Sequence, residues 1–226
     1  MIRGLLMSGL GVAGTLALLL AARWLPERLE TMQAEEMQAI IDRAEAGDVK
    51  AQYELGELYY TGDKGITDWK QSVKWYRAAA EQGHAQAQYN LGVCYEEGIG
   101  IMSNAAKAVK WYRSAAEQGH VQAQFNLGVH YSEGNGVKRS MKEAARWWGK
   151  AAEAGNARAQ YNLGACYENG QGVTRSYQKA VEWYRAAAEQ NLPLAQHQLS
   201  GCYAEGKGVE RNEAEAERWD RRARKN

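Results

Sequence analysis

The chain has 226 residues with 28 basic and 27 acidic side chains, so its formal net charge is only +1. This balance gives no electrostatic footprint for a nucleic-acid backbone, and we expect no nucleic-acid partner. Two prolines, one phenylalanine and plentiful alanine, glycine, tryptophan and tyrosine favour helices joined by glycine turns over a β-sheet.

The first 30 residues differ from the rest. Residues 4–22 carry no charge and are long enough to span a bilayer as a helix. Glycines weaken the first half of this segment, and Ala21-Ala22 is compatible with a cleavage site. We expect residues 1–30 to be a membrane anchor or a cleaved signal peptide, with a soluble buried helix as a third alternative. Either of the first two places the body outside the cytoplasm, on the periplasmic side if the protein is bacterial. The basic flanks are too even to fix the orientation.

A period of 36 residues organises the remaining chain. Such self-similarity is typical of a solenoid, in which each unit packs on its neighbours. We predict a capping helix in 31–47, then repeats at about 48–83, 84–119, 120–155, 156–191 and 192–226. The recurring residues include Leu55, Leu91, Leu127, Leu163 and Leu199, then Tyr59, Tyr95, Tyr131, Tyr167 and Tyr203, then Trp75, Trp111, Trp147, Trp183 and Trp219.

Each unit reads as two antiparallel helices. In the second copy Ala87, Leu91 and Tyr95 fall on one helical face, where we expect Gly92 to admit a neighbouring backbone. Glycines such as Gly98 then turn the chain. The second helices open at residues whose side-chain oxygens can cap a first turn, namely Asp68, Asn104, Ser140, Ser176 and Asn212.

Three cysteines, Cys94, Cys166 and Cys202, share one position of the repeat. Cys94 and Cys166 lie two repeats apart, too far for a disulfide, and a Cys166–Cys202 bridge would need unusually close helices. We expect buried thiols. At the end of the chain, Glu217 and Asp220 replace apolar and aromatic residues, which suits a final helix that stops the stacking.

The pattern Ala-x-x-x-Leu-Gly-x-x-Tyr-x-x-Gly-x-Gly-Val, followed by Lys-Ala-x-x-Trp-Tyr-x-x-Ala-Ala-Glu-x-Gly, resembles the Sel-one-like repeat, a relative of the tetratricopeptide repeat. The fourth copy carries it as Leu163-Gly164, Tyr167, Gly172-Val173 and Trp183-Tyr184. The resemblance implies an all-α fold, a right-handed α-solenoid of antiparallel helix pairs that binds proteins. The sequence departs from the family pattern at 62–65 in the first copy and at Asn191-Leu192-Pro193 in the last, and we expect irregular joints at both places.

Short motifs of other chemistry have structural explanations. Ser176 and Lys179 match Ser-x-x-Lys, but Ser176 is the repeat cap and no companion motif occurs. The Gly-x-Gly turns follow helices, so they are not dinucleotide loops. His84 and His120 hold one repeat position, about 10 Å apart, which is too far for one metal ion. We therefore expect no catalytic residue, no cofactor and no metal.

Two columns are candidates for partner binding. The first helices line the concave groove of such solenoids, and an aromatic column there could hold an extended peptide together with neighbouring amides. The alternative is that these rings pack between neighbouring helices. The candidates are Tyr53, Tyr89, Phe125 and Tyr161, with His197 in the fifth copy, the asparagines Asn90, Asn126 and Asn162, and the interleaved glutamines Gln88, Gln124 and Gln160.

The second column is basic. Arg139, Arg175 and Arg211 lie just before second helices, where the helix dipole disfavours cations. This conflict points to an acidic partner or lipid head groups, with a solvated surface as the alternative. The function we expect is a non-catalytic scaffold or adaptor for protein partners, held at a membrane through residues 4–22 or exported. The alternatives are a hydrolase of the β-lactamase-like kind and a structural or regulatory protein of the envelope or of secretion.

Overall fold

The computed structural model describes residues 34–62 and 67–225. Within these ranges all regular structure is helical, and no helix has both the length and the apolar character needed to cross a bilayer. The predicted span 4–22 and most of the irregular turn 62–65 lie outside the described residues. A helical segment at 34–45 is followed by α2 (Val49–Thr61), α3 (Trp69–Glu81), α4 (Ala85–Glu97), α5 (Ala105–Glu117), α6 (Val121–Glu133), α7 (Met141–Glu153), α8 (Ala157–Asn169), α9 (Tyr177–Glu189), α10 (Pro193–Glu205) and α11 (Glu213–Ala223).

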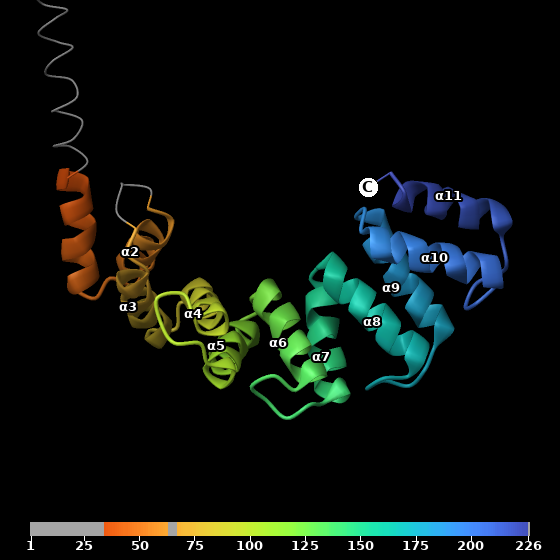
Figure 1. Cartoon of the computed structure of the whole chain (residues 1–226), viewed down its shortest axis with the longest axis horizontal. Coiled ribbons are helices and arrows are strands. Elements are labelled where there is room, and N and C mark those ends of the chain that lie inside the picture. Colours follow the sequence, from red (N-terminus) through yellow and green to blue (C-terminus); the bar gives the residue numbers. More distant parts are fainter. Residues whose placement is uncertain (1–33, 63–66, 226) are drawn as a thin grey trace, which may run out of the picture.

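Consecutive helices pack against one another in pairs, and the pairs follow one another along an arc (Figure 1). The segment 34–45 and α11 lie at the two ends of this arc. The predicted all-α solenoid of helix pairs is confirmed. Each pair buries its recurring residues against its neighbours, since the five recurring leucines are at most 4% exposed.

Glycines in the first helices admit rings. A Cβ at Gly92 would lie 2.7 Å from the Tyr112 ring, which belongs to the second helix of the same repeat. The prediction that Gly92 admits a neighbouring backbone is therefore wrong, because a ring lies there. Backbones do meet at Gly172, which has a φ of +75° and whose Cβ would overlap the Met141 carbonyl of the preceding repeat.

Helix caps follow the sequence closely. The five predicted N-caps of the second helices are confirmed, as in α9, where Ser176 accepts a hydrogen bond from the Lys179 backbone. Among first helices, His84 and His120 cap α4 and α6 through Nδ1. The last copy departs, because Leu192 caps α10 without a side-chain bond and Asn191 takes the left-handed conformation that glycine takes elsewhere.

A buried glutamine column joins each repeat to the helix before it. Gln160 donates to the Ala152 carbonyl at 3.1 Å and accepts from Gln190 at 2.8 Å. Gln52, Gln88, Gln124 and Gln196 make the same bond to the residue eight positions earlier. The interleaved glutamines thus lie inside the joints rather than at the surface.

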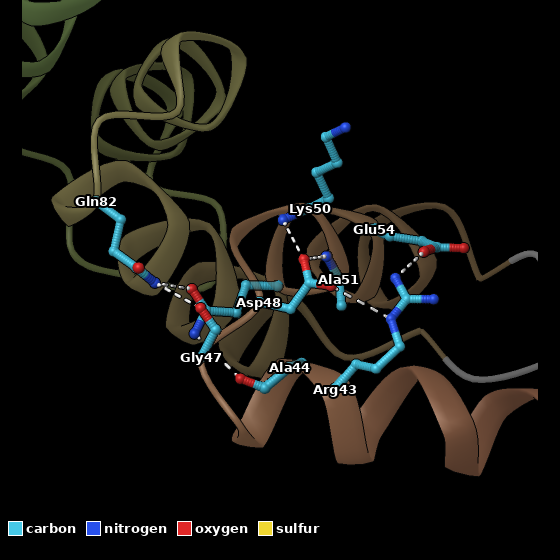
Figure 2. Close-up of polar contacts among 9 residues, drawn as sticks. Arg43, Ala44, Gly47, Asp48, Lys50, Ala51, Glu54 and Gln82 are labelled. Atoms are coloured by element: carbon cyan, nitrogen blue, oxygen red, sulfur yellow. Dashed lines mark hydrogen bonds and ion pairs between the residues drawn. The ribbon is translucent and has the colours of Figure 1, made fainter.

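Figure 2 shows the first joint, between the segment 34–45 and α2. Gln82 donates to the Gly47 carbonyl at 3.2 Å, while Asp48 caps α2. Arg43 forms ion pairs with Asp48 and Glu54, at 3.4 and 3.6 Å. Gln52 donates to the Ala44 carbonyl at 3.1 Å, so the segment docks on the first repeat by the same glutamine contact that joins later repeats.

The three cysteines are free and buried, which confirms the prediction. Burial raises the pKa of each thiol to about 11, so these thiols stay protonated and unreactive at neutral pH.

Candidate partner-binding surface

The predicted aromatic column forms a row of half-buried rings on α2, α4, α6 and α8, which we call the ring row: Tyr53, Tyr89, Phe125 and Tyr161. The inner side of the row packs on the second helices. Tyr53 lies 6.1 Å from Tyr76 and Tyr89 lies 5.8 Å from Tyr112, measured between ring centroids. The rings therefore contribute to packing and still present an outer part to solvent. The fifth member, His197, is exposed on α10.

Histidines link the row across repeats. The ring of Tyr53 stacks on His84 and that of Tyr89 stacks on His120, both with centroids 4.6 Å apart. Because His84 and His120 also cap the following first helices, each stack fixes a ring relative to the next repeat. Burial lowers the pKa of both imidazoles, so they are neutral at pH 7. The first two rings of the ring row are thus held in place by the following repeat.

The asparagines of the column have different surroundings. Asn90 donates to Glu57 at 2.6 Å and accepts from Gln86 at 3.0 Å. Asn126 accepts from Gln122 at 3.0 Å. Asn162 lines a hollow of about 270 Å³ beside α8, and Arg139 of the basic column lines the same hollow. The structure therefore brings together two residues that the sequence placed in separate columns.

A cavity of about 350 Å³ opens between α2, α3 and α4. Its walls include Tyr53, Tyr60, Tyr76 and Tyr89, and the carboxylate of Glu57 faces it. Glu57 accepts hydrogen bonds from Tyr76 Oη at 2.5 Å and from Asn90 Nδ2 at 2.6 Å.

The tyrosines of this cavity keep their protons at neutral pH. Burial and the Glu57 charge raise the pKa of Tyr53 to about 12 and the pKa of Tyr76 further above its ordinary value. Sequence reasoning missed Glu57. The available signal was its break with the repeat, since valine stands at the equivalent positions 93 and 129.

The three predicted arginines are exposed and make different local contacts. Arg139 donates to the Ser132 carbonyl at 2.9 Å, in the last turn of α6. Arg175 lies 5.6 Å from the Tyr177 ring, and Arg211 pairs with Glu213 at 2.5 Å. They form an edge of the solenoid rather than one converging site.

A second residue that sequence reasoning missed is His130, which is 2% exposed and takes the place that cysteine holds in three other copies. Its Nε2 lies 3.2 Å from Glu96, and Glu96 also accepts from Tyr112. No group of three or more metal-ligating side chains gathers in residues 34–62 and 67–225.

Five consecutive segments of the chain, 49–84, 85–120, 121–156, 157–192 and 193–225, match the model of the Sel1 repeat family. The chain belongs to the Sel1 repeat family. No curated protein matches it. Among solved structures, it is 38% identical to a Sel1 repeat protein from Oxalobacter formigenes, with a TM-score of 0.78 over 88% of this chain and 83% of that one.

The chain is also similar to a protective antigen present in uropathogenic Escherichia coli strains, which displays an SLR fold. The two are 44% identical with a TM-score of 0.80, over 84% of this chain but only 40% of the antigen. An immunity protein from Pseudomonas aeruginosa, 22% identical with a TM-score of 0.50 over 84% of this chain and 72% of its own, shares the fold alone.

Sel1 repeat proteins are generally non-catalytic scaffolds that mediate protein–protein interactions, and the Sel1 repeat fold suggests the same role for this chain. The Ser176 hydroxyl accepts a hydrogen bond from the Lys179 backbone. The hydroxyl is engaged as a helix cap, which leaves the Ser-x-x-Lys resemblance with a structural explanation.

Proposed function

We propose that this Sel1 repeat chain is a non-catalytic scaffold that binds a protein or peptide partner along the ring row. One observation carries the proposal. Rings on four successive first helices are half-buried and recur at a fixed step of 36 residues, and three of them pack from behind on tyrosines of the second helices. A repeating rigid surface suits an extended partner, because the partner gains contacts without ordering the scaffold.

Rings suit such an interface physically. Phenol and phenyl side chains bury large areas with little loss of rotamer freedom, and ring pairs contribute about 0.5–1.5 kcal/mol beyond the buried area. Asn90, Asn126 and Asn162 stand beside the ring row and can satisfy polar groups of a bound backbone. Interfaces of this kind concentrate their energy in a few aromatic residues.

The basic edge supplies a second contact in this proposal. Arg139 and Asn162 line one hollow, so an acidic side chain of the partner can bond to both. Arg175 and Arg211 continue the edge in the following copies. Reversing the charge of Arg139 should then weaken binding more than reversing that of Arg211, which already has an internal partner in Glu213.

We place the repeats outside the cytoplasm, anchored through residues 4–22 or released after cleavage. The uncharged run between Arg3 and Arg23 supports this placement. Fractionation and protease accessibility of the full chain, compared with a chain lacking residues 1–30, test it. Equal distribution of the two chains between membrane and cytoplasm would contradict it.

Photo-crosslinking in cells tests the scaffold proposal. A photoreactive phenylalanine replaces Phe125 or Tyr161 in the ring row, and as a control it replaces Glu117, which is exposed at the end of α5. We expect a discrete crosslinked partner from both ring-row positions and none from position 117. The proposal fails if position 117 gives the same products or if the ring-row positions give none.

A further inference from the structure

The cavity around Glu57 has a carboxylate among aromatic walls, and no basic side chain stands among its described lining residues. Tyr53, Tyr60 and Tyr89 line it, and Tyr60 is 37% exposed at its mouth. Glu57 receives hydrogen bonds from Tyr76 and Asn90, which fix its carboxylate in place. Aromatic faces and a carboxylate both attract a cation, and together they disfavour an anion.

Two other glutamates of the chain show how a comparable carboxylate contacts a basic side chain. Glu168 accepts from the second-helix tyrosine Tyr184 and binds Lys207 of the next repeat at 2.7 Å. Lys207 Nζ also lies 4.9 Å from the centroid of the Tyr177 ring. A tyrosine hydroxyl, a carboxylate and a cation over a ring thus form one unit in the fourth repeat.

A similar arrangement occurs in the second repeat, with a histidine in place of the lysine. Glu96 accepts from Tyr112 and lies 3.2 Å from His130, which comes from the next repeat. In both cases the carboxylate has a tyrosine donor from its own repeat and a basic partner from the following one. The basic partner is a lysine in one case and a histidine in the other.

In the first repeat the tyrosine donor and the carboxylate are present as Tyr76 and Glu57. Glu57 stands one helical turn before the place of Glu96, which Tyr60 occupies. Among residues 34–62 and 67–225, no lysine, arginine or histidine pairs with Glu57. The 350 Å³ cavity lies where such a cation would approach.

We propose that this cavity binds a cationic side chain of the partner protein, the ammonium of a lysine or the guanidinium of an arginine. The proposal rests on the scaffold function, because it names the chemistry of the partner at one end of the ring row. The cavity volume is near the lower limit of ligand sites, about 300–1,000 Å³, and suits a single side chain. A partner segment lying on Tyr89 would insert its basic residue beside Glu57.

Small probes test the site without the partner. N-acetyl-lysine methylamide and N-acetyl-arginine methylamide are titrated into the full 226-residue chain, and amide chemical shifts are followed by NMR. The norleucine analogue and the side-chain-acetylated lysine analogue are the uncharged controls. We expect shifts centred on α2 and α4, and at least about tenfold weaker binding of both uncharged probes.

Variants separate the carboxylate from the surrounding charge. We expect Glu57→Gln to weaken binding of the lysine probe about tenfold and Tyr60→Leu to weaken it about threefold. Glu54→Gln, on the same helix but paired with Arg43, should leave it unchanged. Equal binding of the uncharged probes, shifts centred elsewhere, or an undiminished affinity of Glu57→Gln would each overturn the proposal.

The two proposals can fail separately. If the lysine probe binds as expected but photo-crosslinking along the ring row finds no partner, the scaffold function fails and the cation site stands. If the ring row crosslinks a partner but the probes show no preference for charge, the cation site fails alone. The comparison of the charged and the acetylated lysine probes uses the unsubstituted chain. A folding defect in Glu57→Gln would therefore not affect it.

Discussion

At the joint between the second and third repeats the buried His130 lies beside the partly exposed Glu96, with Nε2 3.2 Å from Oε1. Since Nδ1 contacts the Asn135 carbonyl at 3.0 Å, and a carbonyl can only accept, Nδ1 carries a proton. Nε2 then faces a carboxylate, which favours a second proton and a charged ring. The contact is not an aligned hydrogen bond.

This pair predicts a pH-dependent stability. Burial opposes the charge on His130, but Glu96, the Asn135 carbonyl and the nearby Glu133 outweigh it, and the pKa of His130 lies above its ordinary value. A raised folded pKa contributes stability that is complete below about pH 6.5 and is lost as pH rises through the folded pKa. Urea unfolding should therefore show stability falling as pH rises above about 6.5, by at most about 1.4 kcal/mol per pH unit.

At acid pH, the contribution of Glu96 makes stability change with pH in the opposite direction. His130, against the opposing effect of burial and with help from Tyr112, holds the pKa of Glu96 below its ordinary value. Its contribution is present above about pH 4.5 and is lost as pH falls through the lowered pKa. His130→Cys restores the residue of three other copies and should remove the loss above about pH 6.5. An unchanged slope in this variant would show that the pair does not cause it.

Substituting Gly92 tests the close approach of a ring to the first helix. We expect Gly92→Ala to destabilise the chain by about 1–3 kcal/mol, because the new methyl group would overlap the Tyr112 ring. Gly149→Ala is the matched control in α7, where a Cβ has open space. It should stabilise the chain by about 0.5–1 kcal/mol. Equal effects of the two substitutions in chemical denaturation would contradict this packing.

Gly149 also interrupts a ladder of hydrogen bonds. In the other repeats Arg77, Arg113 and Arg185 donate to the tyrosine 18 residues later, at 3.0, 2.7 and 2.8 Å. The third copy has Gly149 at this place, opposite Tyr167, beside a hollow of about 440 Å³.

Gly149→Arg should therefore stabilise the chain beyond Gly149→Ala, by about 0.5–1.5 kcal/mol for the restored bond. Removing the acceptor with Tyr167→Phe should abolish this difference. If Gly149→Arg is no more stable than Gly149→Ala, the ladder does not contribute to stability.

The buried hydrogen bonds of the glutamine column should contribute to the free energy of unfolding. Gln160→Met removes one hydrogen bond from the Ala152 carbonyl and one from the Gln190 amide, so we expect a loss of about 1–3 kcal/mol for the two bonds. Gln178→Met, at an exposed position of α9, should change the free energy of unfolding by less than about 0.5 kcal/mol. Calorimetry of both variants gives the comparison.

Much of the fold could be predicted because the same sequence pattern recurs in five copies. Leu91 and Trp111 recur at a fixed step, and Asn104 begins a helix wherever its counterparts do. Local chemistry fixes these features, so caps and helix pairs follow from the sequence. The close neighbour of Gly92 was mistaken, since the sequence does not say whether a ring or a backbone fills the space beside a glycine.

The candidate site was harder to predict because its partners come from adjacent repeats. Glu57 meets Asn90 from 33 positions later, and His130 meets Glu96 from 34 positions earlier. Neither distance equals the period, so alignment of the copies does not reveal them. Their only signal was a break in the column, a glutamate where two other copies have valine and a histidine where three other copies have cysteine.

The central claim is that the ring row carries partner binding, and a pull-down from native membranes tests it most directly. The full chain is compared with a variant in which leucine replaces Tyr89, Phe125 and Tyr161, after circular dichroism shows equal helicity. We expect partners recovered with the full chain to be lost from the variant. Recovery of the same partners in the same amounts by the folded variant would contradict it.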